Sequence, residues 1–243
     1  MSALAVFLIA VGVADILRSA TARVWPAAAA GPVVTVLCGG LAGLWHVGDI
    51  TALLLVAAAT TSWTLWCRRA EASGTGQIPP LLLFGGSVGV LLAISGLPSP
   101  AAGPVASWLR WVGAGDTDPT RALMIAGVLL LQLVTGNQLV RLVLSAVGAV
   151  RPANQPQPSD QLKGGRLLGP MERILIVGLG LGGQLAAASI VVAAKSIIRF
   201  PELNAQRKSG TGSTIDEVTE YFLVGSFASW LLAMAGLALT VPV

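Results

Sequence analysis

Seven apolar segments, separated by short polar loops, constrain the fold of this chain more than any other feature of its sequence. They lie near residues 2–17, 25–45, 50–67, 80–97, 122–144, 173–196 and 218–239. Each approaches or reaches the roughly 17–25 residues that a helix needs to cross the hydrocarbon core of a bilayer. Backbone N–H and C=O groups find no partner in lipid, so such segments cross as helices. The sequence therefore predicts an all-α integral membrane protein, a bundle of about seven transmembrane helices.

The composition agrees with a surface that faces lipid. Of the 243 residues, 54% are hydrophobic and 11% are charged, whereas a soluble domain carries roughly 25% charged residues. Spans of about 20 residues with short loops leave no room in this sequence for a separate soluble catalytic domain. The net charge of +4 comes from basic residues beside apolar segments, where such residues fix topology and attract anionic lipid headgroups. We therefore expect the lipid bilayer as a partner, and no nucleic acid.

Basic residues alternate between successive loops. Arg18 and Arg23 follow the first apolar segment, Arg68 and Arg69 follow the third, and the loop after the fifth is also net basic. The loops after the second, fourth and sixth segments are close to neutral. Cytoplasmic loops carry the excess of Lys and Arg. The pattern predicts a multi-pass protein of the bacterial cytoplasmic (inner) membrane, with its N-terminus outside and its C-terminus in the cytoplasm.

The chain is expected to form a single membrane domain with two parts. Residues 1–150 form a five-span N-terminal part, and residues 166–243 form a C-terminal two-helix hairpin. Between them, residues 151–165 are rich in Pro, Gln and Gly, a composition typical of linkers. A capping box at residues 214–217 (TIDE) predicts that the last helix begins at Thr214.

Two local predictions concern charged and aromatic residues. Asp15 and Arg18, near the end of the first span, are three residues apart on one helix face, so they can pair near the headgroups. Trp108 and Trp111 lie between a proline and a glycine in the fourth loop, and residues 104–113 therefore predict a short interfacial helix.

The sixth apolar segment predicts one unbroken helix over residues 172–200. At 100° per residue, Arg173, Gln184 and Lys195 fall within about 40° of one another, and Arg199 follows one turn later. One interpretation is a polar path, or a cleft for an anionic headgroup, that faces the bundle interior. The other is that the cations extend to the two interfaces while Gln184 bonds one neighbouring helix.

Small residues predict close contact between the sixth and seventh helices. Gly178 and Gly182 form a GxxxG pattern, which allows helices to approach closely in lipid, and Gly225 and Ser229 repeat the same spacing. The glycines lie within an apolar helix and follow no strand, so they do not indicate a dinucleotide-binding loop.

Polar residues of the fifth and seventh helices complete this region. Glu220 is a candidate ion-pair partner for Lys195 or Arg199, and the alternative is a solvated carboxylate at a helix N-terminus. Asn137 and Arg141 are neighbours on the fifth helix, where amides usually bond between helices and less often line a cavity.

The sequence carries no recognised catalytic or metal-binding motif. The single histidine, His46, has only Asp49 near it, whereas a metal site needs several converging ligands, so neither a metal nor a cofactor is expected. Cys38 and Cys67 are interpreted as apolar fillers without a disulfide. No spacing resembles a P-loop or a nucleophile elbow, which argues against an enzyme. The spans lack an acidic residue near the bilayer centre, which counts against a proton-driven pump.

Four motifs in the C-terminal half resemble a known family. They are GNQLVR at 136–141, GRLLGPMER at 165–173, AKSIIRF at 194–200, and Glu-Tyr followed by Gly-Ser at 220–226. In this order they resemble a family of bacterial polytopic membrane proteins of unknown function, over roughly residues 136–235. Pro170 and Met171 depart from the family pattern, and Ser226 stands where a threonine is expected. The resemblance supplies no activity, but it implies the site residues Glu172, Arg173, Lys195, Ser196, Arg199, Glu202 and Glu220.

Three functions are compatible with these features. The first is a small-solute or ion transporter, a channel-like protein, or an accessory subunit of one, with a polar site between the fifth, sixth and seventh helices. The second is a structural or assembly protein that binds anionic lipid, a membrane partner or a second copy of the chain. The third is an enzyme that acts on a lipid-linked substrate. The expected binding residues are Glu172, Arg173, Gln184, Lys195, Ser196, Arg199, Glu202 and Glu220.

Overall fold

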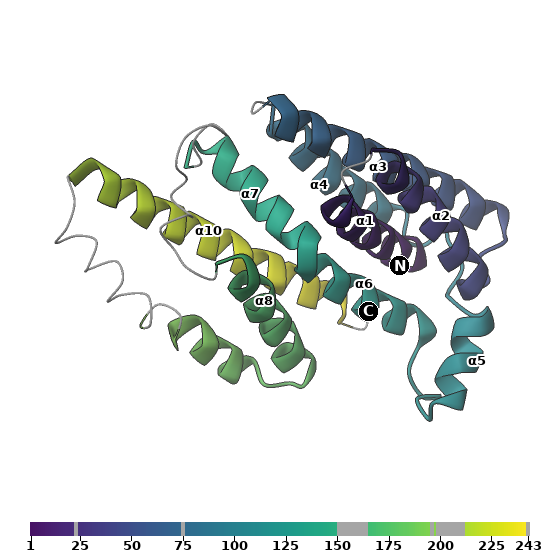
Figure 1. The fold of residues 1–243 in the computed structure, drawn as a ribbon. Helices are drawn as coiled ribbons and strands as arrows, with labels where there is room; N and C mark the ends of the chain where they lie inside the picture. Colours follow the sequence, from purple (N-terminus) through teal and green to yellow (C-terminus); the bar gives the residue numbers. More distant parts are fainter. Residues whose placement is uncertain (22–23, 74–75, 150–164, 195–196, 198–211, 242–243) are drawn as a thin grey trace. The chain divides into compact units, whose positions relative to one another are not determined.

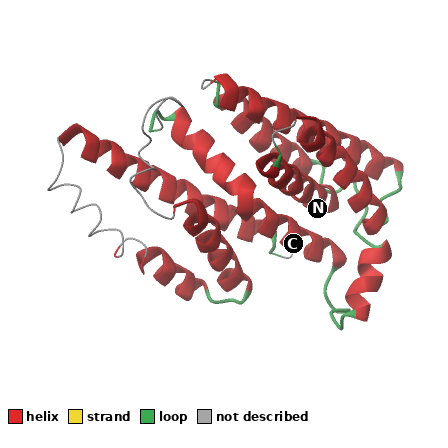
Figure 2. Ribbon diagram, viewed as in Figure 1, coloured by secondary structure: helices red, strands yellow, loops and turns green. Residues whose placement is uncertain are grey.

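A computed structural model describes residues 1–21, 24–73, 76–149, 165–194, 197 and 212–241. All regular structure in these residues is helical (Figure 2). The elements are α1 (Ser2–Ala20), α2 (Val24–Ala42), α3 (Val47–Ser73), α4 (Ile78–Ala93), α5 (Gly103–Trp111), α6 (Pro119–Leu130), the π-helical segment η1 (Leu131–Thr135), α7 (Gly136–Ala146), α8 (Gly165–Leu181), a short helix at Leu185–Ala194, and α10 (Gly212–Leu239). This part of the chain thus confirms an all-helical fold.

Five described helices are long and apolar enough to cross a membrane. They are Ser2–Ala20, Trp25–Ala42, Val47–Ser73, Pro119–Ala146 and Thr219–Leu239. Two shorter apolar helices, Ile78–Ala93 and Leu185–Ala194, lie in the segments expected to be the fourth and sixth spans. An all-helical fold with five candidate membrane-spanning helices is confirmed for the described residues, whereas the count of seven spans and the orientation of the termini stay predictions.

The chain forms two compact units. Unit 1 comprises Met1–Thr135 together with Leu239–Val243, and unit 2 comprises Gly136–Ala238. The linker expected at residues 151–165 falls outside the described residues except for its last residue, which begins α8. Within unit 1, the end of the chain is attached to the start of α6 because Arg121 Nε donates to the Thr240 carbonyl at 3.2 Å.

Helix α1 is the centre of unit 1. It contacts α2, α3, α4, α6 and η1 (Figure 1), and its residues are buried from Ser2 through Gly12. Its crossing with α6 depends on small residues, since a Cβ at Gly12 would lie 2.9 Å from the Leu130 Cβ and one at Gly127 would lie 2.9 Å from the Leu8 Cβ. Such close approach is typical of helix pairs in membranes. A small-residue face therefore lets α1 occupy the interior.

Two shorter features of unit 1 follow from local sequence. Helix α5 (Gly103–Trp111) confirms the short helix expected in the fourth loop, and it packs against α2 and α6.

Segment η1 lies inside the candidate span Pro119–Ala146, where Leu133 has a non-helical backbone (φ −74°, ψ −105°). Irregular backbone at membrane depth persists only where protein surrounds it or a cavity opens beside it.

In unit 2 the expected single helix over residues 172–200 is wrong. Helix α8 ends at Leu181, and a separate helix occupies Leu185–Ala194. Gly183 has a positive φ of 73°, the Gln184 amide donates to Leu179 O at 2.8 Å, and the Gly183 amide donates to Gly180 O at 3.0 Å. These bonds form a Schellman cap, in which the amides that follow a helix donate to its last carbonyls and so end it.

The glycines that bring helices together in unit 2 also differ from those expected. A Cβ at Gly178 would meet open space, and one at Gly182 would touch only the preceding backbone. Gly180 is the α8 glycine that lies against α10, where it touches Leu237, and Gly225 of α10 faces Leu144 of α7. Gly178 and Gly182 therefore do not make the expected contact, because the cap turns the chain at Gly182.

Candidate functional site

The strongest constellation of polar side chains begins on α1 in unit 1. Arg18 Nε donates to Asp15 Oδ1 at 3.1 Å, which confirms the expected pair. The Asp15 side chain is 0% exposed and that of Arg18 only 8%. The expected pair therefore lies inside unit 1, because the helices around α1 enclose the carboxylate. Its place near the headgroups stays a prediction.

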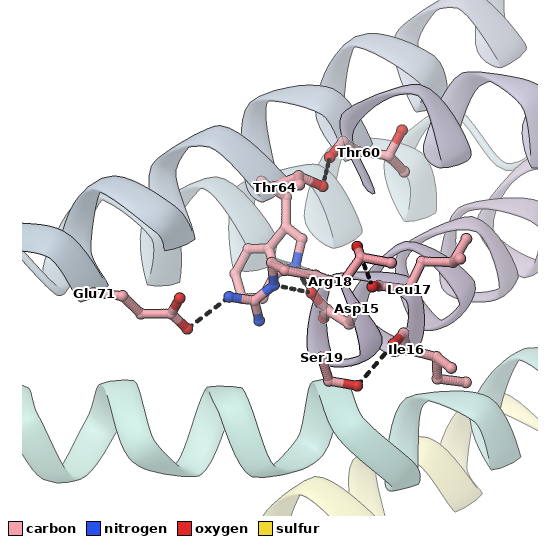
Figure 3. Close-up of polar contacts among 10 residues, drawn as sticks. Asp15, Ile16, Leu17, Arg18, Ser19, Thr60, Thr64 and Glu71 are labelled. Atoms are coloured by element: carbon pink, nitrogen blue, oxygen red, sulfur yellow. Dashed lines mark hydrogen bonds and ion pairs between the residues drawn. The ribbon is translucent and has the colours of Figure 1, made fainter. Parts of the chain in front are cut away.

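Helix α3 supplies the other two members. Trp63 Nε1 donates to both Asp15 oxygens, at 3.1 and 3.3 Å, and Arg18 Nη1 donates to Glu71 Oε1 at 2.6 Å. Figure 3 shows the Arg18 side chain between the two carboxylates. Since Glu71 is 40% exposed, Arg18 joins a fully buried carboxylate to one that reaches the surface of unit 1. We refer to Asp15, Arg18, Trp63 and Glu71 as the charge cluster.

The Trp63 indole is held in place by aromatic packing. Its ring lies 5.3 Å from that of Phe84 on α4, and Phe84 lies 5.7 Å from Phe7 on α1. Tilted aromatic pairs at such distances are favourable beyond their burial. The N–H that donates to Asp15 is therefore positioned by side chains from three helices.

Segment η1 brings a hydroxyl group to the cluster. The Thr135 side chain lies beside the Asp15 carboxylate, and it is fully buried. The backbone of η1 is non-helical at Leu133, where two helices meet at a kink. The kink therefore occurs in the segment that carries Thr135 to the buried acid–base pair.

A second polar group joins two loops of unit 1. Asp49, in the first turn of α3, accepts from the His46 amide at 3.0 Å and from the Ser99 amide at 2.6 Å. Asp49 Oδ2 and Ser99 Oγ both lie near His46 Nδ1, at 3.3 and 3.1 Å. A Ser-His-Asp triad needs serine and carboxylate on opposite nitrogens of the imidazole. The arrangement therefore caps α3 and fastens its loop, and it is no nucleophilic site.

In unit 2 the expected residues Glu172 and Arg173 lie inside the protein. Arg173 is 1% exposed, and its guanidinium donates to Asn137 Oδ1 at 2.8 Å and to Ser229 Oγ at 3.0 Å. Glu172 Oε1 accepts from Trp230 Nε1 at 2.9 Å. The two residues thus connect α8 to α7 and α10, and Arg173 does not extend to an interface.

Glycines make room for this arginine. A Cβ at Gly136 would lie 2.9 Å from Arg173 Nε and Nη2, and one at Gly169 would lie 3.4 Å from Nη1. The motifs at 136–141 and 165–173 therefore meet around one guanidinium group. Ser229, expected as a helix-packing residue, serves as its hydrogen-bond partner.

The other expected binding residues do not join this group in the described structure. Gln184 is exposed in the turn after α8, and Glu220 is exposed on α10. The remaining members lie outside the described residues: Lys195, Ser196, Arg199 and Glu202. The predicted ion pair of Glu220 with Lys195 or Arg199 therefore also falls outside them.

Sequence patterns did not connect three residues of unit 1 with Asp15 and Arg18. Trp63 lies 48 positions after its partner Asp15, and Glu71 lies 53 positions after its partner Arg18. Thr135 lies 120 positions after Asp15. The signal that could have found them is the acid–base pair within an apolar segment, because buried charges require further polar partners.

Comparisons with protein-family models, with curated proteins and with solved structures gave no match to this chain. The resemblance of residues 136–235 to a bacterial membrane-protein family therefore stays a prediction. The geometry of the two units is what bears on function.

Proposed function

We propose that this chain is a multi-pass membrane protein that moves a small solute or an ion across the bilayer, with the charge cluster of unit 1 as its working part. The observation that carries the proposal is the complete burial of Asp15 beside Arg18 within an apolar helix. Charged side chains are costly inside membrane helices, and they usually mark pathways for ions, protons or substrates.

The interrupted helix beside the cluster supports this function. Transporters commonly build their sites from helices whose regular hydrogen bonding is broken near the site. In unit 1 the irregular backbone at Leu133 and the buried Thr135 belong to η1, which packs against α1. The broken helix and the buried carboxylate therefore occur together.

The membrane arrangement that accompanies this function follows the charge pattern. We infer seven spans, an N-terminus outside and basic loops in the cytoplasm of a bacterial cell. The basic loop residues would contact anionic headgroups, and a site for such a headgroup near Lys195 and Arg199 remains part of the proposal.

A flux experiment tests the function. Purified full-length protein is reconstituted into liposomes, and the movement of H⁺, K⁺, Na⁺, Cl⁻ and small uncharged solutes is measured. We expect at least one of these to move faster than in protein-free liposomes, and Asp15→Asn to abolish that movement. Ser19→Ala is the matched control, because Ser19 is exposed on the same turn of α1 and bonds only the Ile16 carbonyl. Folded protein that moves none of them contradicts the proposal.

A structural or assembly role is the second candidate. It is favoured by the fact that Arg18 has a carboxylate on each side and Arg173 has partners on two other helices. Under this alternative, substitutions in the charge cluster lower the thermal stability of the protein, and no variant changes any flux.

A further inference from the structure

We infer that Asp15 is a proton-binding site and that the ion handled by the charge cluster is a proton. The inference rests on the proposed transport function and names its ion. The sequence places no acidic residue near the bilayer centre, which counts against a proton-driven pump. The inference depends instead on enclosure by protein, because the side chains of unit 1 surround Asp15 completely.

The groups around Asp15 exclude metal cations. Its oxygens face the Arg18 Nε–H and the Trp63 Nε1–H, at 3.1 to 3.3 Å. Hard cations require a shell of several oxygen ligands, and N–H donors turn positive hydrogens toward the position that such a cation would occupy. No group of three or more His, Cys, Asp or Glu side chains gathers in the described part of the chain. A proton needs only one lone pair on one carboxylate oxygen.

The charge of the cluster changes favourably when one proton binds. With both carboxylates ionised, Asp15, Arg18 and Glu71 together carry one negative charge. A proton on Asp15 forms one O–H bond and brings the sum to zero, while Arg18 keeps Glu71 as its partner at 2.6 Å. An arginine left without a carboxylate in a protein interior would be strongly destabilising. Glu71 removes that cost, so Arg18 has an ionic partner in both states.

A hydroxyl group is placed to receive the new O–H. Thr135 lies beside the Asp15 carboxylate and is fully buried. A hydroxyl group accepts as well as donates, whereas the indole and guanidinium groups only donate. Thr135 can therefore donate to the ionised form of Asp15 and accept from its protonated form, so the protonated form also has a partner.

The other elements around α1 add few titratable groups. Helices α2 and α4 carry no Asp, Glu, Lys, Arg or His over their described residues. On α3, Cys67 lies near Arg18, and Arg68 and Arg69 add positive charge in the turn before Glu71. Helix α6 contributes Arg121, which bonds the Thr240 carbonyl. Asp15 and Glu71 are thus the groups of the cluster that can exchange a proton.

Two measurements on full-length protein test the inference. Infrared difference spectroscopy of the detergent-solubilised protein, over the pH range in which it stays folded, reports the C=O band of a protonated carboxyl group. We expect a band that appears as the pH falls and that Asp15→Asn removes, while Ser19→Ala retains it. In liposomes with an internal pH dye, an imposed pH gradient should dissipate faster than in protein-free liposomes. Asp15→Asn should return the rate to that of protein-free liposomes, and Glu71→Gln should lower it.

The outcomes separate this inference from the proposed function. If K⁺, Na⁺ or an uncharged solute moves but neither the Asp15 band nor proton flux is observed, the inference that Asp15 binds and transfers a proton is overturned. The proposal that the protein is a transporter then still stands. An Asp15 band in a protein that moves no solute overturns transport and leaves the proton-binding site standing. The band together with proton flux that depends on Asp15 supports both.

Discussion

At the scale of single residues, Asp15 and Arg173 are charged groups that lie inside their units and obtain partners there. Asp15 receives hydrogen bonds from Trp63 and Arg18, and Arg173 is enclosed by Asn137, Ser229 and the bare backbone of glycine. Breaking a buried charged pair costs about 3–5 kcal/mol because the remaining charge is left uncompensated. A glycine or an indole N–H is therefore as much a part of each site as the charge itself.

Gly136 provides a test of the arginine enclosure in unit 2. Gly136→Ala places a methyl group 2.9 Å from Arg173 Nε, so the guanidinium must move away from Asn137 and Ser229. We expect a loss of about 1–3 kcal/mol in the free energy of unfolding, the usual cost of leaving a buried polar group unsatisfied. The measurement is unfolding of the purified protein in detergent, by heat or by denaturant.

Gly178→Ala is the control for this change. A Cβ there meets open space within α8, so replacing the glycine should stabilise the helix by about 0.5–1 kcal/mol through its lower entropy in the unfolded chain. The two substitutions should therefore move stability in opposite directions. Equal shifts would show that the Arg173 enclosure is not closely packed.

At the scale of elements, the break after α8 shows how local chemistry overrides apolar patterning. Residues 174–194 are mostly apolar and carry no charge, which predicts one long helix, yet the helix ends at Leu181. Four glycines occur between Gly178 and Gly183, and glycine is the residue that adopts a positive φ without steric cost. The Schellman cap at Gly183 then satisfies the last carbonyls of α8.

The cap predicts a clear difference between neighbouring glycines. Gly183 has φ of 73°, so Gly183→Ala should cost about 1–2 kcal/mol, the penalty for an L-residue in the left-handed region. Gly182→Ala should have little effect, because Gly182 does not have a positive φ and its Cβ would make ordinary contacts at 3.5 Å. Thermal unfolding in detergent compares the two variants. An unbroken helix through residue 183 would make them equivalent.

At the scale of the whole molecule, span length and loop charge together predict a path of the chain through a membrane. Five described helices have the length and hydropathy of spans, and alternation of basic loops predicts which side each loop occupies. Reporter fusions should place residues 68–76 and 151–165 in the cytoplasm and residues 99–118 outside. A reporter that is active outside the cytoplasm when fused within 151–165 would refute the predicted topology.

The sequence alone determined the fold class, the acid–base pair on the first helix and the short helix in the fourth loop. Hydropathy and helix periodicity are local properties, and residues three apart on a helix meet whatever surrounds them. Helix periodicity also indicated Arg173, whereas Glu172 was implied by the resemblance of the motif at 165–173 to a known family. Local patterns did not, however, show that a run of apolar residues would be interrupted by a glycine cap.

Only the tertiary structure decided what surrounds those residues. Trp63 and Thr135 reach Asp15 because α3 and η1 both pack against α1. Gly136 and Ser229 come together around Arg173 for the same reason. Burial of a charge is a property of all the helices around it, and no segment carries that information by itself. Hydropathy therefore indicates that a segment belongs in a bilayer, whereas packing determines which of its polar groups face a partner.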